Sequence, residues 1–366
     1  MALTSKEKSV LQKEVVDILK PYPKGLLLLA PRVGKTKIII DLIKRDKYES
    51  ILWVTPSAEL AEKDIPEEFI KWKAKRYIKK LTTSTYASLP KVKGEFDIII
   101  LDENQYLTER GAKNLFDKTL TSKALIGMTG TSTQHFDKIE MFNKLSLKSL
   151  YDISINKAVD IGLLSDYEIN VIKVPLSDKK DYLSGPKNNM FTTSEKKNYE
   201  YLSKKVKDSD MYSIKFKILN RMRAIKNSPS KLEAVKSLLK DFKEERTLIF
   251  CGSIKQAEDI CEYTYHSKTN GEDLISFKEG GINRLSLVNA GGTGHTFKKV
   301  KNLVMIQTDS DKNGISSQKI SRALLSQKGH KALIWVICLE GTQDEKWVES
   351  TLRNFDSKKI NYLKWK

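Results

Sequence analysis

The chain has 366 residues, of which 40% are hydrophobic and 30% charged, as in globular proteins of two or three domains. No apolar run approaches the ~20 residues that cross a bilayer, and the opening MALTSKEKSV lacks the apolar core of a signal peptide. We therefore expect a cytoplasmic protein with no membrane association. The three scattered cysteines, Cys251, Cys261 and Cys338, are expected to be buried reduced thiols.

Net charge gives the first indication of a partner. Lys and Arg number 65 against 46 Asp and Glu, so the formal net charge is +19. Such an excess favours binding to the phosphate backbone of nucleic acid, although a Lys-rich surface can also serve solubility alone. Because most of these cations are Lys, a point charge, backbone contact is favoured over the reading of bases.

The first half of the chain alternates short apolar runs with helical patterns. Residues 5–20 predict an amphipathic helix that Pro21 and Pro23 end, and a second helical pattern begins at Thr36. Four apolar runs predict buried strands, at residues 26–29, 51–54, 98–101 and 124–128. Apolar strands separated by helices are typical of a parallel sheet covered by helices on both faces.

The same alternation restarts in the second half. Further strands are predicted at residues 247–250, 285–288, 303–306 and 332–336. Between the halves, residues 176–230 are rich in Lys, Ser and Asn and predict a basic insert or connector, helical over 199–224. The basic and aromatic tail, 358–366, is expected to be a final packed helix. The predicted class is α/β, with one domain over 1–150 and a second over 151–366 that includes the insert.

A candidate phosphate-binding loop follows the first predicted strand. The segment LLLLAPRVGKTKIII places Gly34, Lys35 and Thr36 between an apolar strand and an apolar helix. In such a loop the backbone N–H groups of a helix N-terminus face the phosphates of ATP, Lys reaches the β- and γ-phosphates, and Thr ligates Mg²⁺. The full pattern has a glycine where Leu29 stands, so an ordinary strand–helix turn is the alternative.

Two adjacent carboxylates end the strand FDIIILDENQYL. Burying Asp102 and Glu103 at the end of an apolar strand is costly unless they meet a cation or other partners. At the carboxyl edge of a parallel sheet they would lie beside the phosphate loop, with Asp102 holding Mg²⁺ and Glu103 positioning the attacking water. A helix N-cap with an acidic first turn is the alternative reading.

The order of these and further motifs resembles the superfamily 2 helicases and translocases. Within residues 53–72, the family pattern implies a backbone-contacting turn at Thr55, Pro56 and Ser57, and Thr85 matches a second contact with nucleic acid. In GMTGTST (127–133), the positions of Thr129, Gly130 and Thr131 match the motif that couples the ATP state to domain closure. Residues 156–174 resemble the crossover segment of branch-migration and restriction-type members.

The second half is similar to Swi/Snf-type translocases in particular. Residues 285–309 resemble their Gly-Gly-Thr-Gly motif, which implies that Gly294 lies near the nucleotide. The same motif implies strand contacts for Thr293, Lys298 and Lys299. Residues 316–329 resemble their last motif, in which Gln318 and Arg322 occupy the places of a Gln and a γ-phosphate-sensing Arg.

Some positions depart from the family pattern. Leu325 stands where a second Arg is usual, so the arginine finger is either missing or supplied by Arg322 alone, with Arg32 and Arg284 as substitutes. Gln12 is a weak match to the adenine-reading Gln, and Arg32 belongs to the phosphate loop. A finger typically contributes ~10³–10⁵ in rate, so low turnover is one consequence.

The resemblance implies two tandem RecA-like domains with ATP and Mg²⁺ in the cleft between them. It implies an ATP-dependent DNA helicase or duplex translocase, in a branch-migration or fork-remodelling role, with catalytic residues Lys35, Asp102, Glu103, Gln318 and Arg322. The alternatives are a nucleic-acid-binding protein whose ATPase is weak or lost, and an RNA helicase. We expect a monomer of bacterial or phage origin without a structural metal, since the four histidines form no ligand cluster.

Overall fold

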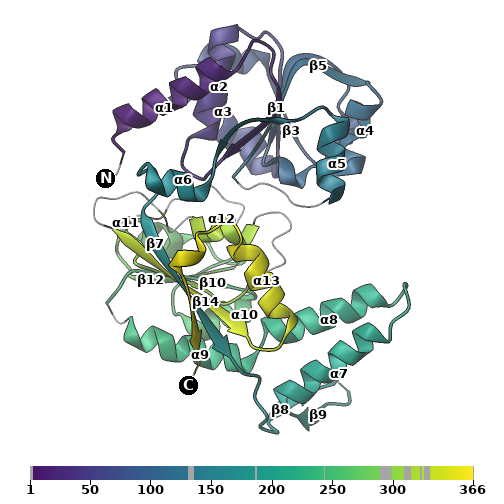
Figure 1. Cartoon of the computed structure of the whole chain (residues 1–366), viewed down its shortest axis with the longest axis vertical. Coiled ribbons are helices and arrows are strands. Elements are labelled where there is room, and N and C mark those ends of the chain that lie inside the picture. Colours follow the sequence, from purple (N-terminus) through teal and green to yellow (C-terminus); the bar gives the residue numbers. More distant parts are fainter. Residues whose placement is uncertain are drawn as a thin grey trace. The chain divides into compact units, whose positions relative to one another are not determined.

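The computed structural model describes residues 3–365 except for 131–135, 186–187, 243, 289–296, 298, 309–314, 322–323 and 325–329. The chain divides into two compact units. Unit 1 comprises residues 1–165 with 312–321 and 325–329, and unit 2 comprises 166–311, 322–324 and 330–366. Each unit contains one large sheet with helices packed against it (Figure 1).

The unit 1 sheet has six strands in the order β3-β2-β4-β5-β1-β6, and every pair is parallel. Its strands are β1 (Lys24–Leu29), β2 (Ile51–Thr55), β3 (Leu81–Thr85), β4 (Gly94–Asp102), β5 (Leu120–Thr129) and β6 (Ser149–Ile153). The four predicted apolar runs are β1, β2, β4 and β5. Strand β2 is buried along its whole length, as expected of a parallel strand covered on both faces.

Figure 1 shows α1, α2 and α3 on one face of this sheet and α4 and α5 on the other. The helices of unit 1 are α1 (Ser5–Ile18), α2 (Lys35–Asp46), α3 (Ile65–Lys71), α4 (Glu109–Phe116), α5 (Phe136–Lys144), α6 (Ile155–Asp160) and α12 (Ile315–Ser321). Helix α1 begins at a capping box formed by Thr4 and Glu7 and ends before Pro21, as the sequence predicts. Ile38, Ile39 and Ile40 of α2 are fully buried.

The unit 2 sheet has seven parallel strands in the order β11-β12-β10-β13-β14-β7-β15. They are β7 (Asp166–Val174), β10 (Thr247–Cys251), β11 (Thr264–Tyr265), β12 (Arg284–Val288), β13 (Asn302–Met305), β14 (Lys331–Leu339) and β15 (Ile360–Lys364). Helices α9 (Pro229–Asp241), α10 (Ile254–Ile260), α11 (Glu272–Glu279) and α13 (Gln343–Leu352) accompany this sheet. The predicted α/β class with two parallel sheets is confirmed. The three cysteines are buried and form no disulfide, as expected.

Two segments differ from expectation. Residues 151–165 lie in unit 1 rather than with the second domain, because β6 pairs with β1 and α6 follows it directly. The tail was expected to be a helix, and this is wrong, because Ile360–Lys364 forms edge strand β15 beside β7. A helix of nine residues is marginal, whereas pairing with the open edge of β7 satisfies the backbone of the tail.

The predicted basic insert contains two long helices instead of one. Helices α7 (Glu195–Lys207) and α8 (Ile214–Lys226) pack against each other and are joined by a turn at residues 208–213. We call this hairpin, residues 195–226, the arm. A small antiparallel pair, β8 (Tyr182–Ser184) and β9 (Phe191–Thr193), precedes it and lies at its base (Figure 1).

Candidate nucleotide-binding site

The phosphate loop joins β1 to α2. Its two left-handed residues are Arg32 (φ 74°) and Gly34 (φ 95°), and Gly34 is the N-cap of α2. Leu29, where the full pattern has glycine, is the fully buried last residue of β1. The leucine at this position therefore packs in the core of the sheet, and the loop makes its first left-handed turn three residues later, at Arg32. Lys35 and Thr36 open the first turn of α2, where N–H groups without helical partners favour an anion.

Gln12 of α1 closes over this loop. Its amide donates to the carbonyl of Val33 at 2.7 Å, and the side chain is buried. A Cβ on Gly34 would lie 2.2 Å from Gln12 Nε2, so glycine is required there both for its backbone angle and for this close approach. Gln12 therefore contacts the backbone of the phosphate loop. Its predicted contact with the nucleotide stays a prediction.

The acidic pair stands at the carboxyl end of β4, which is separated from β1 by β5. Asp102 is the last residue of the strand, and Glu103 has φ 49° and ψ 57°, a left-handed conformation rare for a residue with a side chain. Tyr86 Oη donates to the Asp102 carbonyl at 2.8 Å and so fixes the backbone at this turn. Glu103 does occupy the N-cap position of a short 3-10 helix, Asn104–Tyr106, but its side chain makes no capping hydrogen bond and the first turn contains no acid.

Three side chains converge on the Glu103 carboxylate. Lys35 Nζ lies 2.7 Å from Oε1, and the amides of Gln105 and Gln318 each donate to Oε2 at 2.9 Å. Gln318 comes from α12, which belongs to unit 1 although it is 215 positions away in sequence. Charge-assisted bonds of this kind hold a carboxylate in one orientation. The structure thus brings together three of the predicted catalytic residues, Lys35, Glu103 and Gln318.

The pKa values of the two acids move in opposite directions. Burial, together with the neighbouring negative charge of Glu103, raises the pKa of Asp102 to about 6. For Glu103 burial acts in the same upward sense, but the charge and hydrogen bond of Lys35 outweigh it and lower the pKa. Glu103 is therefore an anion with an ion-pair partner, whereas the carboxylate of Asp102 has, among the described residues, no cation close enough to keep its pKa low.

The raised pKa of Asp102 indicates whether these residues suit Mg²⁺. A cation beside Asp102 would relieve both the desolvation and the repulsion that raise its pKa. Carboxylate and hydroxyl oxygens are the ligands that Mg²⁺ takes, usually one or two from protein with the remainder from water and phosphate. The donor set of Thr36 and Asp102 fits this description.

Lys8 is a cation near the loop that sequence analysis missed. Its Cε lies 3.8 Å from the Cβ position that Gly34 leaves empty. Burial lowers the pKa of Lys8, and the positive charges of Arg32, Lys71 and Lys37 lower it further. Cations gathered in this way indicate a site built for an anion. The available signal was the spacing of Lys8 and Gln12, four apart on one helix face.

The predicted nucleic-acid contacts lie at the carboxyl ends of neighbouring strands. Thr55 of β2 and Thr85 of β3 are paired in register. Thr55 is fully buried and donates to the Ser57 carbonyl at 2.8 Å, so it shapes the turn, whereas Ser57 is exposed. Pro56 lies between them, half-buried. Thr85 accepts from Ser88 N at 3.2 Å and caps the following turn.

The coupling motif lies against the phosphate loop. Thr129 is the buried last residue of β5, in register with Leu28 of β1. A Cβ on Gly130 would meet Pro31 at 3.5 Å, within ordinary contact. Gly130 therefore lies next to the phosphate loop, and the coupling role of Thr129 and Gly130 stays a prediction.

Several predicted site residues lie outside the described part of the chain. They are Thr131, Thr293, Gly294, Lys298 and Arg322. Lys299 is described and is exposed, with φ 55°.

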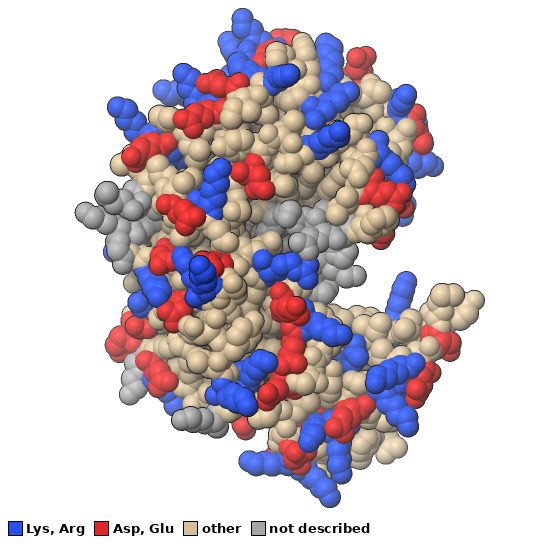
Figure 2. All heavy atoms as spheres, in the orientation of Figure 1, with Lys and Arg blue, Asp and Glu red and all other residues tan. Residues whose placement is uncertain are grey.

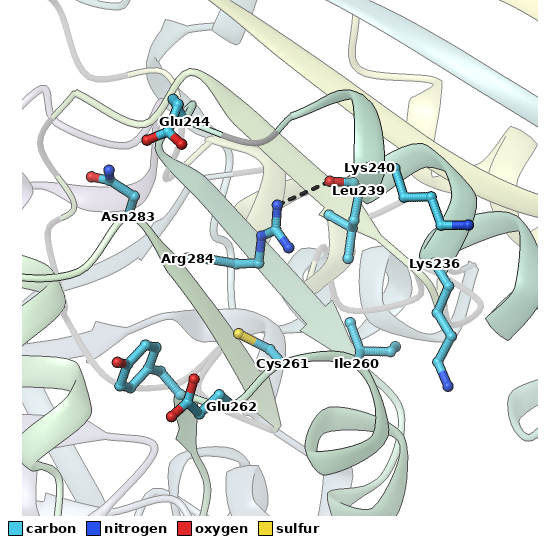
Figure 3. A pocket seen from close by; sticks show the side chains of 10 residues that line it. Lys236, Leu239, Lys240, Glu244, Ile260, Cys261, Glu262, Asn283 and Arg284 are labelled. Atoms are coloured by element: carbon cyan, nitrogen blue, oxygen red, sulfur yellow. Dashed lines mark hydrogen bonds between the residues drawn. The ribbon is translucent and has the colours of Figure 1, made fainter.

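Arg284 cannot substitute for an arginine finger. It begins β12, at the amino end of the strand, whereas a nucleotide site is expected at the carboxyl ends. Its guanidinium donates to the carbonyls of Leu239 at 2.9 Å and Phe242 at 3.4 Å, where α9 ends. Figure 3 shows the bond from Arg284 to Leu239, both of which line a pocket of about 580 Å³ in unit 2. The suggestion that Arg284 replaces the finger is wrong.

Comparison with known proteins adds two curated relatives, both from archaea. The putative DNA 3'-5' helicase Rad25 of Halobacterium salinarum is 21% identical over 375 residues, which cover 95% of this chain and 57% of that protein. The DNA 3'-5' translocase XPB2 of Sulfurisphaera tokodaii is 22% identical over 377 residues, covering 91% of this chain and 82% of the relative. The chain thus spans little more than half the length of the first relative. No protein-family model matches the chain.

Solved structures match at the level of the fold. The Type ISP restriction-modification enzyme LlaBIII bound to DNA matches all of this chain and 31% of its own, with a TM-score of 0.63 and 12% identity. Dbp5 of S. cerevisiae, bound to RNA and ADP BeF3, matches over 97% of this chain and 89% of its own, with a TM-score of 0.58 and 12% identity. The chain has the fold of two tandem RecA-like domains, similar to these structures.

The resemblance to superfamily 2 helicases and translocases is thereby confirmed along nearly the whole chain. The parallel sheet order β4-β5-β1 places the acids that end β4 on the same edge as the phosphate loop that follows β1. The archaeal relatives leave a bacterial or phage origin as a prediction only. Within the described residues, no helix is both long enough and apolar enough to cross a lipid bilayer.

Proposed function

We propose that this chain is an ATP-dependent DNA helicase or duplex translocase. The observation that carries the proposal is the convergence of Lys35, Gln105 and Gln318 on Glu103, at the end of the strand beside the phosphate loop. Phosphoryl transfer needs positioning and charge neutralisation rather than a covalent intermediate, and this cluster offers both. The two curated relatives, named as a helicase and a translocase, support the proposal.

Lys35 has two alternative partners in the proposed cycle. Without nucleotide it pairs with Glu103 at 2.7 Å. When ATP binds, the Lys35 ammonium group pairs with the triphosphate instead, and the N–H groups of the α2 N-terminus bind the same phosphates. Glu103 is then released to accept a hydrogen bond from the attacking water, while Gln105 and Gln318 keep its carboxylate in place. ATP binding thereby converts Glu103 from an ion-pair partner into the water-positioning residue.

Mg²⁺ is expected to be held by the Thr36 hydroxyl and the Asp102 carboxylate. When bound, the ion neutralises charge on the phosphate oxygens during transfer. Arg322 is proposed as the γ-phosphate-sensing residue, and Gly294 as a further nucleotide contact.

The proposed contacts with nucleic acid on unit 1 are Pro56, Ser57 and Thr85, at the carboxyl ends of β2 and β3. On unit 2 the proposed contacts are Thr293, Lys298 and Lys299. Lys299 comes three residues before β13, so it lies at the amino end of that strand. Thr55 is proposed to act through the turn it stabilises. We propose that Thr129, Gly130 and Thr131 transmit the nucleotide state, because Gly130 packs beside the loop. We further propose DNA rather than RNA as the partner, a monomeric state, and a cytoplasmic location.

The test is phosphate release by the full chain with Mg²⁺ and ATP at stated salt. Each assay is run alone and with forked DNA, linear duplex, single-stranded DNA or RNA. We expect DNA to stimulate phosphate release more than RNA does. In Lys35→Ala we expect the rate of phosphate release to fall at least ~100-fold. Lys6→Ala, on the exposed face of α1, is the matched control and keeps the wild-type rate.

Two results would overturn the proposal. A rate in Lys35→Ala equal to that of wild type would show that the phosphate loop does not hydrolyse ATP. Stronger stimulation by RNA than by any DNA would replace a DNA motor with an RNA helicase.

A further inference from the structure

The arm carries uncovered apolar side chains at its free end. Met211 and Tyr212, in the turn between α7 and α8, are 85% and 96% exposed. Phe216, one turn into α8, is 64% exposed. Exposed aromatic side chains at the end of a projecting element are costly in water unless a partner covers them. Figure 2 shows an uncharged patch at the end of the arm with acidic side chains beside it. The same turn contains Asp208 and Asp210.

The sides of the arm are strongly basic. Residues 195–226 contain ten Lys and Arg against four Asp and Glu, so this short segment has a formal charge of +6. Among the described residues, no carboxylate forms an ion pair with Lys204, Lys207, Lys215 or Lys217. Lys196, at the root of the arm, does form an ion pair, with Asp178. The arm therefore carries a net positive charge, of which Asp210 offsets part near Lys217.

A buried polar network fixes the root of the arm to the unit 2 core. The carboxylate of Glu195, the first residue of α7, is 5% exposed and accepts hydrogen bonds from Ser228 Oγ, Ser230 Oγ and Ser177 N. Four residues later, Tyr199 Oη accepts from Gln343 N of α13 at 2.8 Å. Buried networks with all partners in place specify one geometry. The arm is thus held as a fixed projection that moves with its unit.

We propose that the arm binds nucleic acid, with its lysines on the phosphates and Tyr212 stacked on an exposed base. This inference rests on the proposed function, because that function is the reason to expect nucleic acid as the partner of the arm. Alternation of Lys with aromatic residues suits a backbone with bases, since lysines contribute salt-dependent backbone contact and aromatic rings stack on any base. The rigid root suits a motor, because force on the nucleic acid is then carried into unit 2. The arm is a contact separate from the strand-end residues named above.

The experiment compares three variants of the full chain by fluorescence anisotropy with forked DNA. Met211→Ser with Tyr212→Ser removes the apolar end. Lys204→Gln, Lys207→Gln, Lys215→Gln and Lys217→Gln together remove the free charges. Tyr362→Ser is the control, because Tyr362 is also an exposed tyrosine, at 60%, but lies on β15. Melting curves establish that each variant is folded.

We expect the end variant to bind forked DNA about 10-fold more weakly than wild type. The charge variant should lower the slope of log affinity against log salt by about 0.7–0.9 for each phosphate that the arm no longer neutralises. A photoreactive side chain at position 212 should crosslink to DNA. The control should match wild type in DNA affinity and in the salt slope.

Unchanged DNA affinity in both arm variants, with no crosslink, would overturn the inference and leave a protein partner for the arm. Loss of binding to vesicles of anionic lipid, with DNA binding intact, would overturn it in favour of a membrane. Failure of the proposed function is a different result, since it would abolish DNA-stimulated phosphate release in wild type, whatever the arm binds.

Discussion

Lys35 and Glu103, 68 positions apart in sequence, form an ion pair of 2.7 Å that joins the phosphate loop to the end of β4. Both side chains are mostly buried, at 16% and 24% exposure. The pair neutralises two charges that would otherwise be buried without a partner. When ATP binds, the phosphates must replace Glu103 as the partner of Lys35. Hydrolysis then depends on the groups that still hold the Glu103 carboxylate, Gln105 and Gln318.

Replacing Glu103 with Gln should separate binding from hydrolysis. The amide keeps the shape of the side chain but cannot polarise water, so kcat should fall by roughly 10²–10⁴. ATP affinity should be equal or higher, because Lys35 no longer has a competing anion. Single-turnover hydrolysis and binding of a fluorescent ATP analogue measure the two effects. Weakened binding with normal kcat would contradict this role.

Removal of the two amides should test the orientation of Glu103. Gln318→Ala and Gln105→Ala each leave one hydrogen bond fewer on Oε2, and we expect each to lower kcat by about 10-fold with little change in KM. Gln318→Glu should be worse, since it places a second negative charge beside Glu103. A changed KM with constant kcat would assign these residues to ATP binding instead.

Gly34→Ala should fail for two separable reasons. The methyl would lie 2.2 Å from Gln12 Nε2, and φ 95° is strained for any residue with a Cβ. We expect ATP binding to be lost and stability to fall by about 1–3 kcal/mol. Adding Gln12→Ala should restore part of the stability by removing the clash, while the backbone strain persists. Full restoration would show that the strain is unimportant.

The raised pKa of Asp102 predicts opposite effects on stability and activity. Its folded-state pKa of about 6 lies above the ordinary value of 3.8, so its ionisation opposes folding increasingly as pH rises through 6. Asp102→Asn should therefore raise the free energy of unfolding of the nucleotide-free protein at pH 8, by on the order of 1–3 kcal/mol, with the gain shrinking below pH 6. Thermal melting across pH 5–8 measures this. The variant should lose Mg²⁺-dependent hydrolysis at every pH.

The buried pair Lys231–Asp344 predicts a non-additive effect on unit 2. Lys231 Nζ lies 2.5 Å from Asp344 Oδ2, and both side chains are fully buried. Lys231→Met leaves an uncompensated charge and should cost about 3–5 kcal/mol in denaturant unfolding. Lys231→Met with Asp344→Asn should recover most of that loss, since the amide still accepts from Leu339 N. Additive losses would mean that the two residues act independently.

Much of the fold was predictable from local patterns. The apolar runs of β1, β2, β4 and β5 needed burial on both faces, and a parallel sheet supplies it whatever the strand order. Strand β15 could not be read in this way, because its exposed residues have no apolar alternation and its stability comes from pairing with β7. The two-helix form of the arm was not predictable either, since polar helices have weak periodicity.

The sequence by itself determined that Gly34, Lys35 and Thr36 open a helix after a buried strand, and that Asp102 and Glu103 end another. These features depend only on residues close together in the chain. Tertiary structure alone decided which distant groups meet them, with Lys8 and Gln12 against the loop and Gln318 on Glu103. The physical reason is that these contacts depend on the order of the strands and on how the helices pack against them, and local sequence periodicity contains no information on either.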